Sequence, residues 1–473
     1  MMNEIQFAEE RKLGETATIA AISTAQAPGG IGIIRISGND AVTVAERVFR
    51  SARGKKLSDL PGYHALYGSV WTSGKDGAPE KIDEAVALVF RAPASFTGED
   101  VVELSCHGGL YLLRRALSAV LEAGASAAGP GEFTRRAFMN GKLGLTEAES
   151  VMELISAQGK QAARAALAGH DGALERRIAG IRESLVNQAA HLSAWADYPE
   201  EEIPEVDTAD LRESLVSARG EIETLLRQFE AGRAIREGVN TVIAGRPNVG
   251  KSTLMNLLAG CERSIVTQYA GTTRDIVEDT VILGDVLLHL ADTAGIRDTE
   301  DPVESIGVDR ARDRVRSAQL VLAVFDSSQE LNGEDRELIE SLQEIPSVAV
   351  VNKSDLETKI DFAYLENHFR QIVFISALRG DGLEQLEKAV AETLQTASLD
   401  PAAGMLFTER QRDAARRAGD CLEEALSALD AGFTLDAVTV SLEGAVSALL
   451  ELTGERAGTA IVDAIFSHFC VGK

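Results

Sequence analysis

The stretch Gly245-Arg-Pro-Asn-Val-Gly-Lys-Ser252 follows the pattern GxxxxGK[ST] and decides the fold of the chain's centre. Residues 241–244 before it are typical of a short buried strand, and residues 253–259 after it are typical of a helix. In such a strand–loop–helix unit, the backbone N–H groups and the positive end of the helix can hold phosphate groups. Lys251 is placed to reach the β- and γ-phosphates of a nucleotide, and Ser252 to bind Mg²⁺. The stretch therefore predicts a nucleotide-binding α/β domain.

Two downstream motifs predict which base is bound. Asn352-Lys-Ser-Asp355 follows the apolar run 348–351, and Ser376-Ala-Leu378 follows the run 372–375. The Asp355 carboxylate can accept both hydrogens from the N1 and N2 edge of guanine, and the Ala377 N–H can donate to the guanine carbonyl. Adenine lacks that pair of donors, and an unpaired buried carboxylate is costly. The sequence therefore predicts a site for GTP rather than ATP.

The motif Asp292-Thr-Ala-Gly295 completes the set, because Asp292 can hold Mg²⁺ through water and the Gly295 N–H can meet the γ-phosphate. Together the motifs resemble the Ras-like GTPase domain, in which ligands lie at the carboxyl ends of mostly parallel strands. The residues expected at the GTP site are Asn248, Val249, Gly250, Lys251, Ser252, Thr253, Thr267, Gln268, Tyr269, Ala270, Gly271, Thr272, Thr273, Asp292, Thr293, Ala294, Gly295, Asn352, Lys353, Asp355, Ser376, Ala377 and Leu378.

Two details indicate the kind of GTPase. Ile296 stands where Ras-like proteins carry the glutamine that holds the attacking water. Asn248, with the segment 267–273, resembles the potassium-activated GTPases, which implies K⁺ ligands at Asn248, Thr267, Tyr269 and Thr272 and Mg²⁺ ligands at Ser252 and Thr273. A cation there would stabilise charge developing between the β- and γ-phosphates. The alternative is that Asn248 merely suits a turn.

Composition limits the other possibilities. A chain of 473 residues with 45% apolar residues can build two to four globular domains. Its four cysteines lie in no zinc or disulfide spacing, and no apolar run reaches the length of a membrane span, so we expect a reduced cytoplasmic setting without a membrane partner. The formal charge of −26 disfavours nonspecific nucleic-acid binding and argues against DNA as a partner. The pairs Arg135-Arg136 and Arg176-Arg177 are candidate RNA contacts, but each pair is more typical of a solvated face.

The sequence pattern predicts a multidomain α/β protein. Strand-like segments at 31–36 and 85–90 indicate an N-terminal α+β domain over 1–141. Helical spacing begins near Thr146, which forms a candidate capping box with Glu149, and gives a helical domain over 142–236. A Ras-like P-loop GTPase domain is expected at 237–396, inserted before a second helical part at 397–473.

Motifs outside the GTPase block resemble the MnmE (TrmE) family of tRNA-modification GTPases over essentially the whole chain. They are Thr18-Ile-Ala-Ala-Ile-Ser-Thr24, Gly29-Gly-Ile-Gly-Ile-Ile-Arg-Ile-Ser-Gly38, Ser95-Phe-Thr-Gly-Glu-Asp100, Pro130-Gly-Glu-Phe-Thr-Arg-Arg136 and the terminal Phe469-Cys-Val-Gly-Lys473. The last has Val where the family more often has Ile.

The resemblance implies addition of an aminomethyl or carboxymethylaminomethyl group to C5 of the wobble uridine of certain tRNAs. The implied partners are tRNA, a second copy of the chain, and an FAD enzyme like MnmG (GidA). It also implies that the N-terminal domain dimerises and binds a 5-substituted or methylene tetrahydrofolate, and that the GTPase domains meet transiently during hydrolysis.

The same resemblance assigns further residues. The folate site would use Arg35, Glu103, Lys142 and Lys473, with Glu103 accepting from the pterin's guanidine-like edge. Without the resemblance, Arg35 and Glu103 are ordinary strand-end charges. Glu304 would orient the attacking water through another water, although Glu300 and Asp301 are close competitors. Catalysis would thus rest on Glu304, Asn248 and Lys251.

One functional alternative belongs to a different class. A ribosome-assembly GTPase would act only by nucleotide-switched binding, and it would carry a basic RNA-binding module such as a KH-type GxxG segment. The sequence contains no such module. A scaffold with an idle nucleotide site would lack Lys251 or Ser252, and both are present.

Overall fold

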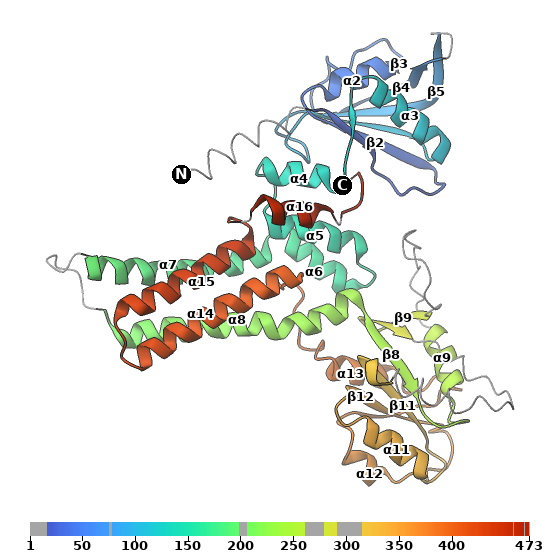
Figure 1. Cartoon of the computed structure of the whole chain (residues 1–473). Coiled ribbons are helices and arrows are strands. Elements are labelled where there is room, and N and C mark those ends of the chain that lie inside the picture. The colour runs from blue at the N-terminus through green and yellow to red at the C-terminus, as the bar shows by residue number, and fades with distance from the viewer. Residues whose placement is uncertain are drawn as a thin grey trace. The chain divides into compact units, whose positions relative to one another are not determined.

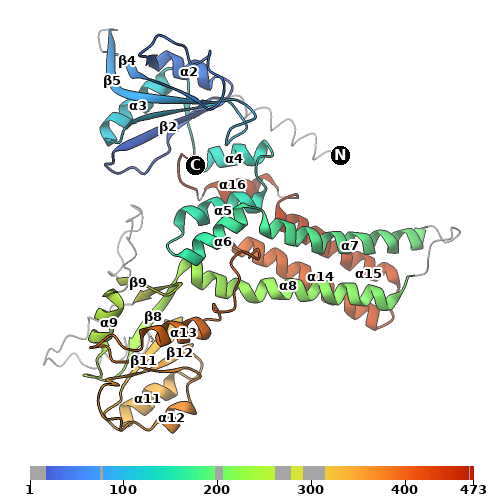
Figure 2. The same cartoon turned by 180° about the vertical axis from the view of Figure 1, so that it is seen from behind.

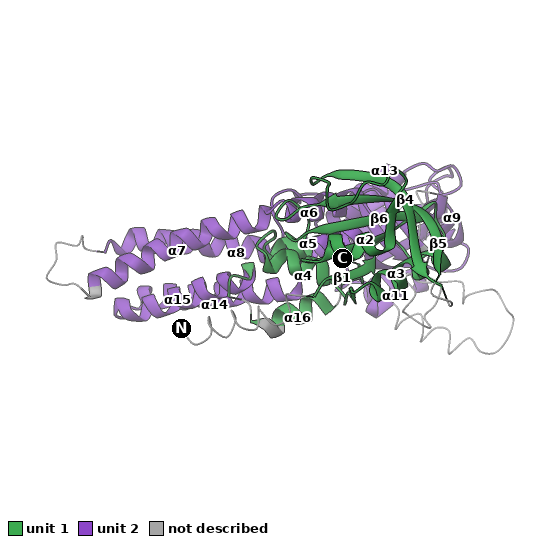
Figure 3. Cartoon of the chain, turned by 90° about the horizontal axis from the view of Figure 1, so that it is seen from above, with its two compact units in different colours: residues 1–149, 453–473 green, residues 150–452 purple. Residues whose placement is uncertain are grey.

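The computed structural model describes residues 17–74, 78–197, 206–260, 279–290, 315–456, 458–467 and 469–472 (Figure 1). The chain forms two compact units, one of residues 1–149 with 453–473 and one of residues 150–452 (Figure 3). The first unit thus joins the two ends of the sequence, and the second contains everything between them.

The first unit is built on a sheet that has seven strands in the described residues, in the order β3-β4-β5-β6-β2-β1-β7. All neighbouring strands are antiparallel except β1 and β7. The strands are β1 (Ile19–Ile22), β2 (Ile31–Ser37), β3 (Phe49–Ser51), β4 (His64–Ser73), β5 (Pro79–Phe90), β6 (Val101–His107) and β7 (Ser126–Ala127). The helices of this part are α2 (Ala41–Val48), α3 (Leu110–Glu122) and α4 (Glu132–Met139).

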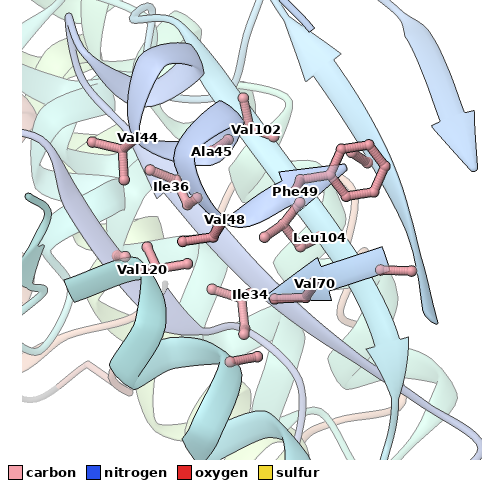
Figure 4. Close-up of a cluster of buried hydrophobic side chains, with 14 of the residues drawn as sticks. Ile34, Ile36, Val44, Ala45, Val48, Phe49, Val70, Val102, Leu104 and Val120 are labelled. Carbon is pink, nitrogen blue, oxygen red and sulfur yellow. The ribbon is translucent and has the colours of Figure 1, made fainter. Parts of the chain in front are cut away.

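Alternation along the strands decides which face of this sheet is buried. Ile34 and Ile36 on β2 are fully buried and pack with Val48 of α2 and Val120 of α3 (Figure 4). Arg35, between the two isoleucines, therefore points to the other face, where Glu103 of β6 is its directly paired neighbour. Alternation and strand register thus place Arg35 and Glu103, two of the four predicted folate residues, next to each other.

The last residues of the chain join this unit. Helix α16 (Thr459–Ser467) packs on α4, and Phe466 and Phe469 contact each other. Beyond it, the Gly131 N–H donates to the carbonyl of Cys470 at 3.3 Å, and Val471 pairs with Pro130. The terminal segment therefore lies against the residues that open α4.

The second unit contains a bundle of long helices. They are α5 (Leu145–Ser156), whose first residues belong to the first unit, α6 (Lys160–His170), α7 (Ala173–Asp197), α8 (Thr208–Glu237), α14 (Glu409–Asp430) and α15 (Leu435–Thr453). Helices α7, α8, α14 and α15 lie side by side in both views (Figures 1 and 2). Apolar residues at helical spacing on α8, such as Leu215, Ile222 and Phe229, share one core with Leu422 and Leu442. The two helical stretches of the sequence thus form one core.

Helix α5 begins two residues earlier than a Thr146 N-cap would require. It starts at Leu145, so Thr146 lies inside the first turn and is not the N-cap. The side chain of Glu147 accepts the N–H of Gly144 at 2.8 Å and so satisfies one N–H group at the helix start. The predicted capping box of Thr146 and Glu149 was wrong in its register.

The GTPase block has a sheet with six described strands in the order β13-β12-β11-β8-β10-β9. All pairs are parallel except that of β9 with β10. Its elements are β8 (Val239–Ala244), α9 (Lys251–Gly260), β9 (Asp279–Leu283), β10 (Val286–Leu290), β11 (Leu320–Asp326), α11 (Gly333–Ser341), β12 (Ser347–Asn352), α12 (Phe362–Glu366), β13 (Ile372–Phe374) and α13 (Leu383–Thr393). The Ras-like α/β class was therefore predicted correctly.

Candidate nucleotide and folate sites

The loop after β8 has glycine at two positions where a side chain would clash with neighbouring atoms. Gly250 has φ +100°, and a Cβ there would lie 2.2 Å from Nδ2 of Asn352. Gly245 has φ +152°, and a Cβ there would lie 2.4 Å from the carbonyl of Val324. Asn248 also has a left-handed backbone, with φ +64°. Because asparagine tolerates this conformation, the geometry agrees with the turn alternative as well as with a ligand role.

Lys251 lies over this loop. Its Nζ donates to the carbonyls of Gly245 at 2.6 Å and Arg246 at 2.8 Å. Burial lowers the pKa of Lys251, because the charged ammonium is partly removed from water. Ser252 and Thr253 are exposed at the start of α9, whereas the Val249 side chain is buried in the core. The hydroxyl of Ser252 is thus accessible to a cation at the helix start.

Asn352 connects the predicted base-binding motifs to the phosphate loop. Its Nδ2 donates to the carbonyl of Val249 at 2.9 Å, and its Oδ1 accepts the Ala377 N–H at 3.0 Å. Because this buried side chain uses both ends of its amide, it fixes three loops that come from β8, β12 and β13. The carboxyl edge of the sheet therefore holds the parts of one site.

Asp355, which the sequence predicts to read guanine, lies beside Ser376 in this site. Oδ1 of its carboxylate accepts from the Ser376 hydroxyl at 2.8 Å, and Arg379 Nε lies 3.7 Å from Oδ2. The hydrogen bond from Ser376, aided by the charge of Arg379, holds the pKa of Asp355 below its usual value. Leu378 is 82% exposed beside it and offers an apolar surface to a ligand.

Sequence analysis missed two supports of the site. Asp326, at the end of β11, bonds Lys353, and Asp335 of α11 lies 3.3 Å from Nε of Arg246 in the phosphate loop. Both carboxylates are 2% exposed. The only sequence signal for Asp326 is that it ends the apolar run of β11, a position that many turn residues share.

Part of the predicted site falls outside the described residues. These residues are Thr267, Gln268, Tyr269, Ala270, Gly271, Thr272, Thr273, Asp292, Thr293, Ala294, Gly295 and Glu304, and Lys473 of the folate set. Their assignments therefore stay predictions.

The structure brings Arg35 and Glu103 into an ion pair. Arg35 donates through Nε to Glu103 Oε1 at 2.9 Å, and its guanidinium carbon lies 5.7 Å and 5.6 Å from the rings of Phe96 and Phe133. Nη1 also lies 3.5 Å from the carbonyl of Gly472. Both charged side chains are 17% exposed, so a ligand can still reach them. Phe96, Phe133 and Gly472 surround the pair, and sequence reasoning did not place them there.

Lys142 has a separate contact. Its Nζ donates to the carbonyl of Pro93 at 3.1 Å, and the residue is exposed. No direct bond between Lys142 and the Arg35–Glu103 pair is found among the described residues.

The two arginine pairs proposed as RNA contacts have structural partners. Arg136 is buried and binds Glu99 and Glu132. The interpretation of Arg136 as part of a solvated face was therefore wrong. Arg135 pairs with Asp463 at 3.1 Å. Arg176 donates to the carbonyl of Asp171, and Arg177 to that of Gly404. These contacts leave Arg136 unavailable to an RNA backbone.

Two searches of the described ranges gave negative results. No described helix is long and apolar enough to cross a membrane. Likewise, the part of the chain that the structure covers contains no group of three or more His, Cys, Asp or Glu side chains arranged to hold a metal ion. Hydroxyl and carbonyl ligands of the kind predicted for Mg²⁺ and K⁺ are not of this type.

Comparison with known proteins gives two family matches and full-length relatives. Residues 18–142 match the GTP-binding protein TrmE N-terminus, and residues 145–470 match the MnmE helical domain. The tRNA modification GTPase MnmE of Symbiobacterium thermophilum is 46% identical over 459 residues, covering 96% of this chain and 99% of the relative. That of Geobacillus kaustophilus is 41% identical over 464 residues, covering 97% and 100%.

Solved structures give weaker likenesses. A variant of Aquifex aeolicus Era bound to GDP.AlF4− is 26% identical and covers 39% of this chain and 66% of that one, with a TM-score of 0.27. The G domain of T. maritima FeoB is 27% identical and covers 33% and 98%, with a TM-score of 0.25. The family matches and the relatives suffice: the chain belongs to the MnmE (TrmE) family of tRNA modification GTPases.

Proposed function

We propose that this chain hydrolyses GTP and couples hydrolysis to modification of the wobble uridine of tRNA. The observation that carries the GTP part is the pair of bonds from Asn352, which joins the phosphate loop to the loop that reads guanine. Sequence identity of 41–46% along nearly the whole chain to relatives named tRNA modification GTPase MnmE supports a role in tRNA modification. It favours that role over the role of a ribosome-assembly GTPase.

Nucleoside mass spectrometry of tRNA tests this function. Cells without the protein should lose the aminomethyl or carboxymethylaminomethyl group at C5 of the wobble uridine. Wild-type protein should restore it, and an Asp355→Asn variant should not. Unaltered wobble uridines in the deletion strain would refute the tRNA role without touching GTP hydrolysis, which is measured separately on the purified protein.

For hydrolysis, we assign the phosphate loop and the exposed Ser252 to GTP and Mg²⁺, with Thr273 as the second Mg²⁺ residue. Asn248, Thr267, Tyr269 and Thr272 offer the oxygen ligands that suit K⁺. Water attacks the γ-phosphorus, the bond to the β–γ bridging oxygen breaks, and GDP and phosphate leave. Glu304 orients that water, and Lys251 offsets charge on the phosphates. Contact between two GTPase domains would stimulate the reaction.

The N-terminal unit would supply the one-carbon donor site. Glu103 accepts from the pterin edge of a 5-substituted or methylene tetrahydrofolate, while Arg35, Lys142 and Lys473 bind its carbonyl or acidic tail. The exposed fraction left on the Arg35–Glu103 pair supports this assignment. Calorimetric titration of the full chain with a tetrahydrofolate should show binding that Glu103→Gln removes. The Glu84→Gln variant, at an exposed glutamate of β5, is the control.

The remaining partners follow from the family. We infer a homodimer through the N-terminal unit and a complex with a flavin enzyme like MnmG (GidA) in the cytoplasm. Co-purification with that flavin enzyme, scored by its FAD absorbance, tests the complex.

A further inference from the structure

Lys353 of the guanine-reading motif is held at both ends by the turn that closes β11. Its Nζ donates to Oδ2 of Asp326 at 2.6 Å, and its carbonyl accepts from the hydroxyl of Ser327 at 2.7 Å. The same ammonium donates to the carbonyl of Asn248 in the phosphate loop at 2.9 Å. Three separate loops therefore meet at one side chain.

The backbone around this contact is left-handed at two places. Lys353 has φ +62° and Asn248 has φ +64°, and both stand among the few described non-glycine residues with positive φ. Such conformations cost energy and persist where surrounding contacts hold them. The hydrogen bond from Lys353 to the carbonyl of Asn248 connects these two residues directly, and the Ser327 hydroxyl holds the backbone of Lys353.

The Asp326 side chain is only 1% exposed, so its charge needs a close partner. Oδ1 accepts from the N–H and the hydroxyl of Ser328 at 3.0 Å and 2.7 Å, which leaves Oδ2 for the ammonium. Burial acts to raise the pKa of Asp326, but the bonds from Lys353 and Ser328 outweigh it and lower that pKa. The carboxylate is thus ionised and committed to Lys353.

Strand order explains why this turn can reach both loops. β11 lies between β8 and β12, so its carboxyl end is flanked by the phosphate loop and by the guanine-reading loop. The Ser327 N–H also donates to the carbonyl of Asn352 at 2.9 Å. The turn is therefore fixed to β12 by its backbone and to Lys353 by its side chains.

We propose that Asp326 and Ser327 are positioning residues of the nucleotide site, which hold Lys353 on the carbonyl of Asn248 and so set the affinity for nucleotide and for the activating K⁺. The K⁺ part rests on the function proposed above for Asn248. Both residues contact Lys353 and act through it.

The Asp326→Asn substitution in the full chain tests the proposal, because it keeps the shape of the side chain and removes its charge. The dissociation constant of a fluorescent GDP analogue should rise about tenfold, since an ammonium that has lost its carboxylate is no longer held in position against the loop carbonyl. The K⁺ concentration that gives half-maximal GTPase activity should rise at least about threefold. Ser327→Ala should change both quantities in the same direction, and Ser327→Thr, which keeps the hydroxyl, should restore them.

Asp361→Asn is the matched control. Asp361 is an exposed N-cap of α12 in the same domain, so its loss should leave both quantities at the wild-type values. Unchanged GDP affinity and half-maximal K⁺ in folded Asp326→Asn and Ser327→Ala would overturn the proposal. If wild-type protein showed no preference for K⁺ over Na⁺, the role of Asn248 would fail, and GDP affinity alone would decide whether Asp326 and Ser327 position Lys353.

Discussion

The hydroxyl of Ser376 donates a 2.8 Å hydrogen bond to Oδ1 of Asp355. This bond joins the two motifs that are predicted to read guanine, and it stabilises the ionised carboxylate. The neighbouring loop thus fixes the carboxylate of Asp355, and the same loop carries the Ala377 N–H.

Asp355→Asn should exchange the base preference. An amide in place of the carboxylate offers a donor to a carbonyl, so xanthosine triphosphate should be preferred and GTP affinity should fall about a hundredfold. Competition against a fluorescent nucleotide measures both. Unchanged discrimination between the two triphosphates would count against the base-reading role.

Because the pKa of Asp355 is lowered, GTP affinity of the wild type should stay constant from about pH 8 to about pH 5.

Asn248→Gly separates the two interpretations of that residue. Glycine accepts the left-handed backbone at φ +64° but has no side-chain oxygen. If Asn248 is a K⁺ ligand, stimulation of GTPase activity by K⁺ relative to Na⁺ should fall about tenfold or more, while GDP binding is retained. If the glycine variant kept the full K⁺ stimulation, the role of Asn248 would be to form the turn and not to bind K⁺. Asn367→Gly, at an exposed position, is the control.

Arg136 and Arg135 should differ sharply when each is replaced by methionine. The Arg136 side chain is 10% exposed and binds Glu99 and Glu132, so its loss should destabilise the N-terminal unit by about 3–5 kcal/mol. Arg135 is 42% exposed in a surface pair, and its loss should cost less than about 1 kcal/mol. Denaturant unfolding of the full chain measures the difference, with a Trp195→Phe background so that the fluorescence of Trp71 alone is followed. Equal effects would contradict the buried network.

Cys106 and Cys470 should react with iodoacetamide at very different rates. Burial, reinforced by the charge of Asp83, raises the pKa of Cys106 to about 12, whereas Cys470 is exposed. At about pH 8 peptide mass spectrometry should find Cys470 modified first and Cys106 modified only in denaturant.

The raised pKa of Cys106 also means that, between about pH 9 and about pH 12, the folded state keeps a proton that the unfolded state releases. This contribution to stability is therefore complete below about pH 9 and is lost as pH rises toward about 12.

The sequence predicted best where the signal is local. The strand–loop–helix around residues 241–259 and the order of the GTPase motifs depend on short patterns, and β8 and α9 match them. Asp326 was missed because its role depends on Lys353, which is 27 residues away, and on the strand order that brings them together. Arg135 and Arg136 look alike in the sequence, but neighbouring positions on a helix point in different directions, so only Arg136 is buried. The pairing of Arg35 with the carbonyl of Gly472 spans 437 residues and has no local signal.

The shared core of α7, α8, α14 and α15 has a consequence for the order in which the protein can fold during synthesis. Arg236, near the end of α8, donates to the carbonyl of Phe407, which lies 171 residues later and just before α14. The GTPase block between them has its own cores and can fold as soon as it leaves the ribosome. The apolar faces of α7 and α8 must wait for α14 and α15, and α4 must wait for α16, which packs on it, whereas the N-terminal sheet has a core of its own. A chain interrupted after the GTPase block would therefore carry a folded nucleotide domain beside an incomplete helical core, and quality-control proteases would recognise it by that exposed apolar surface.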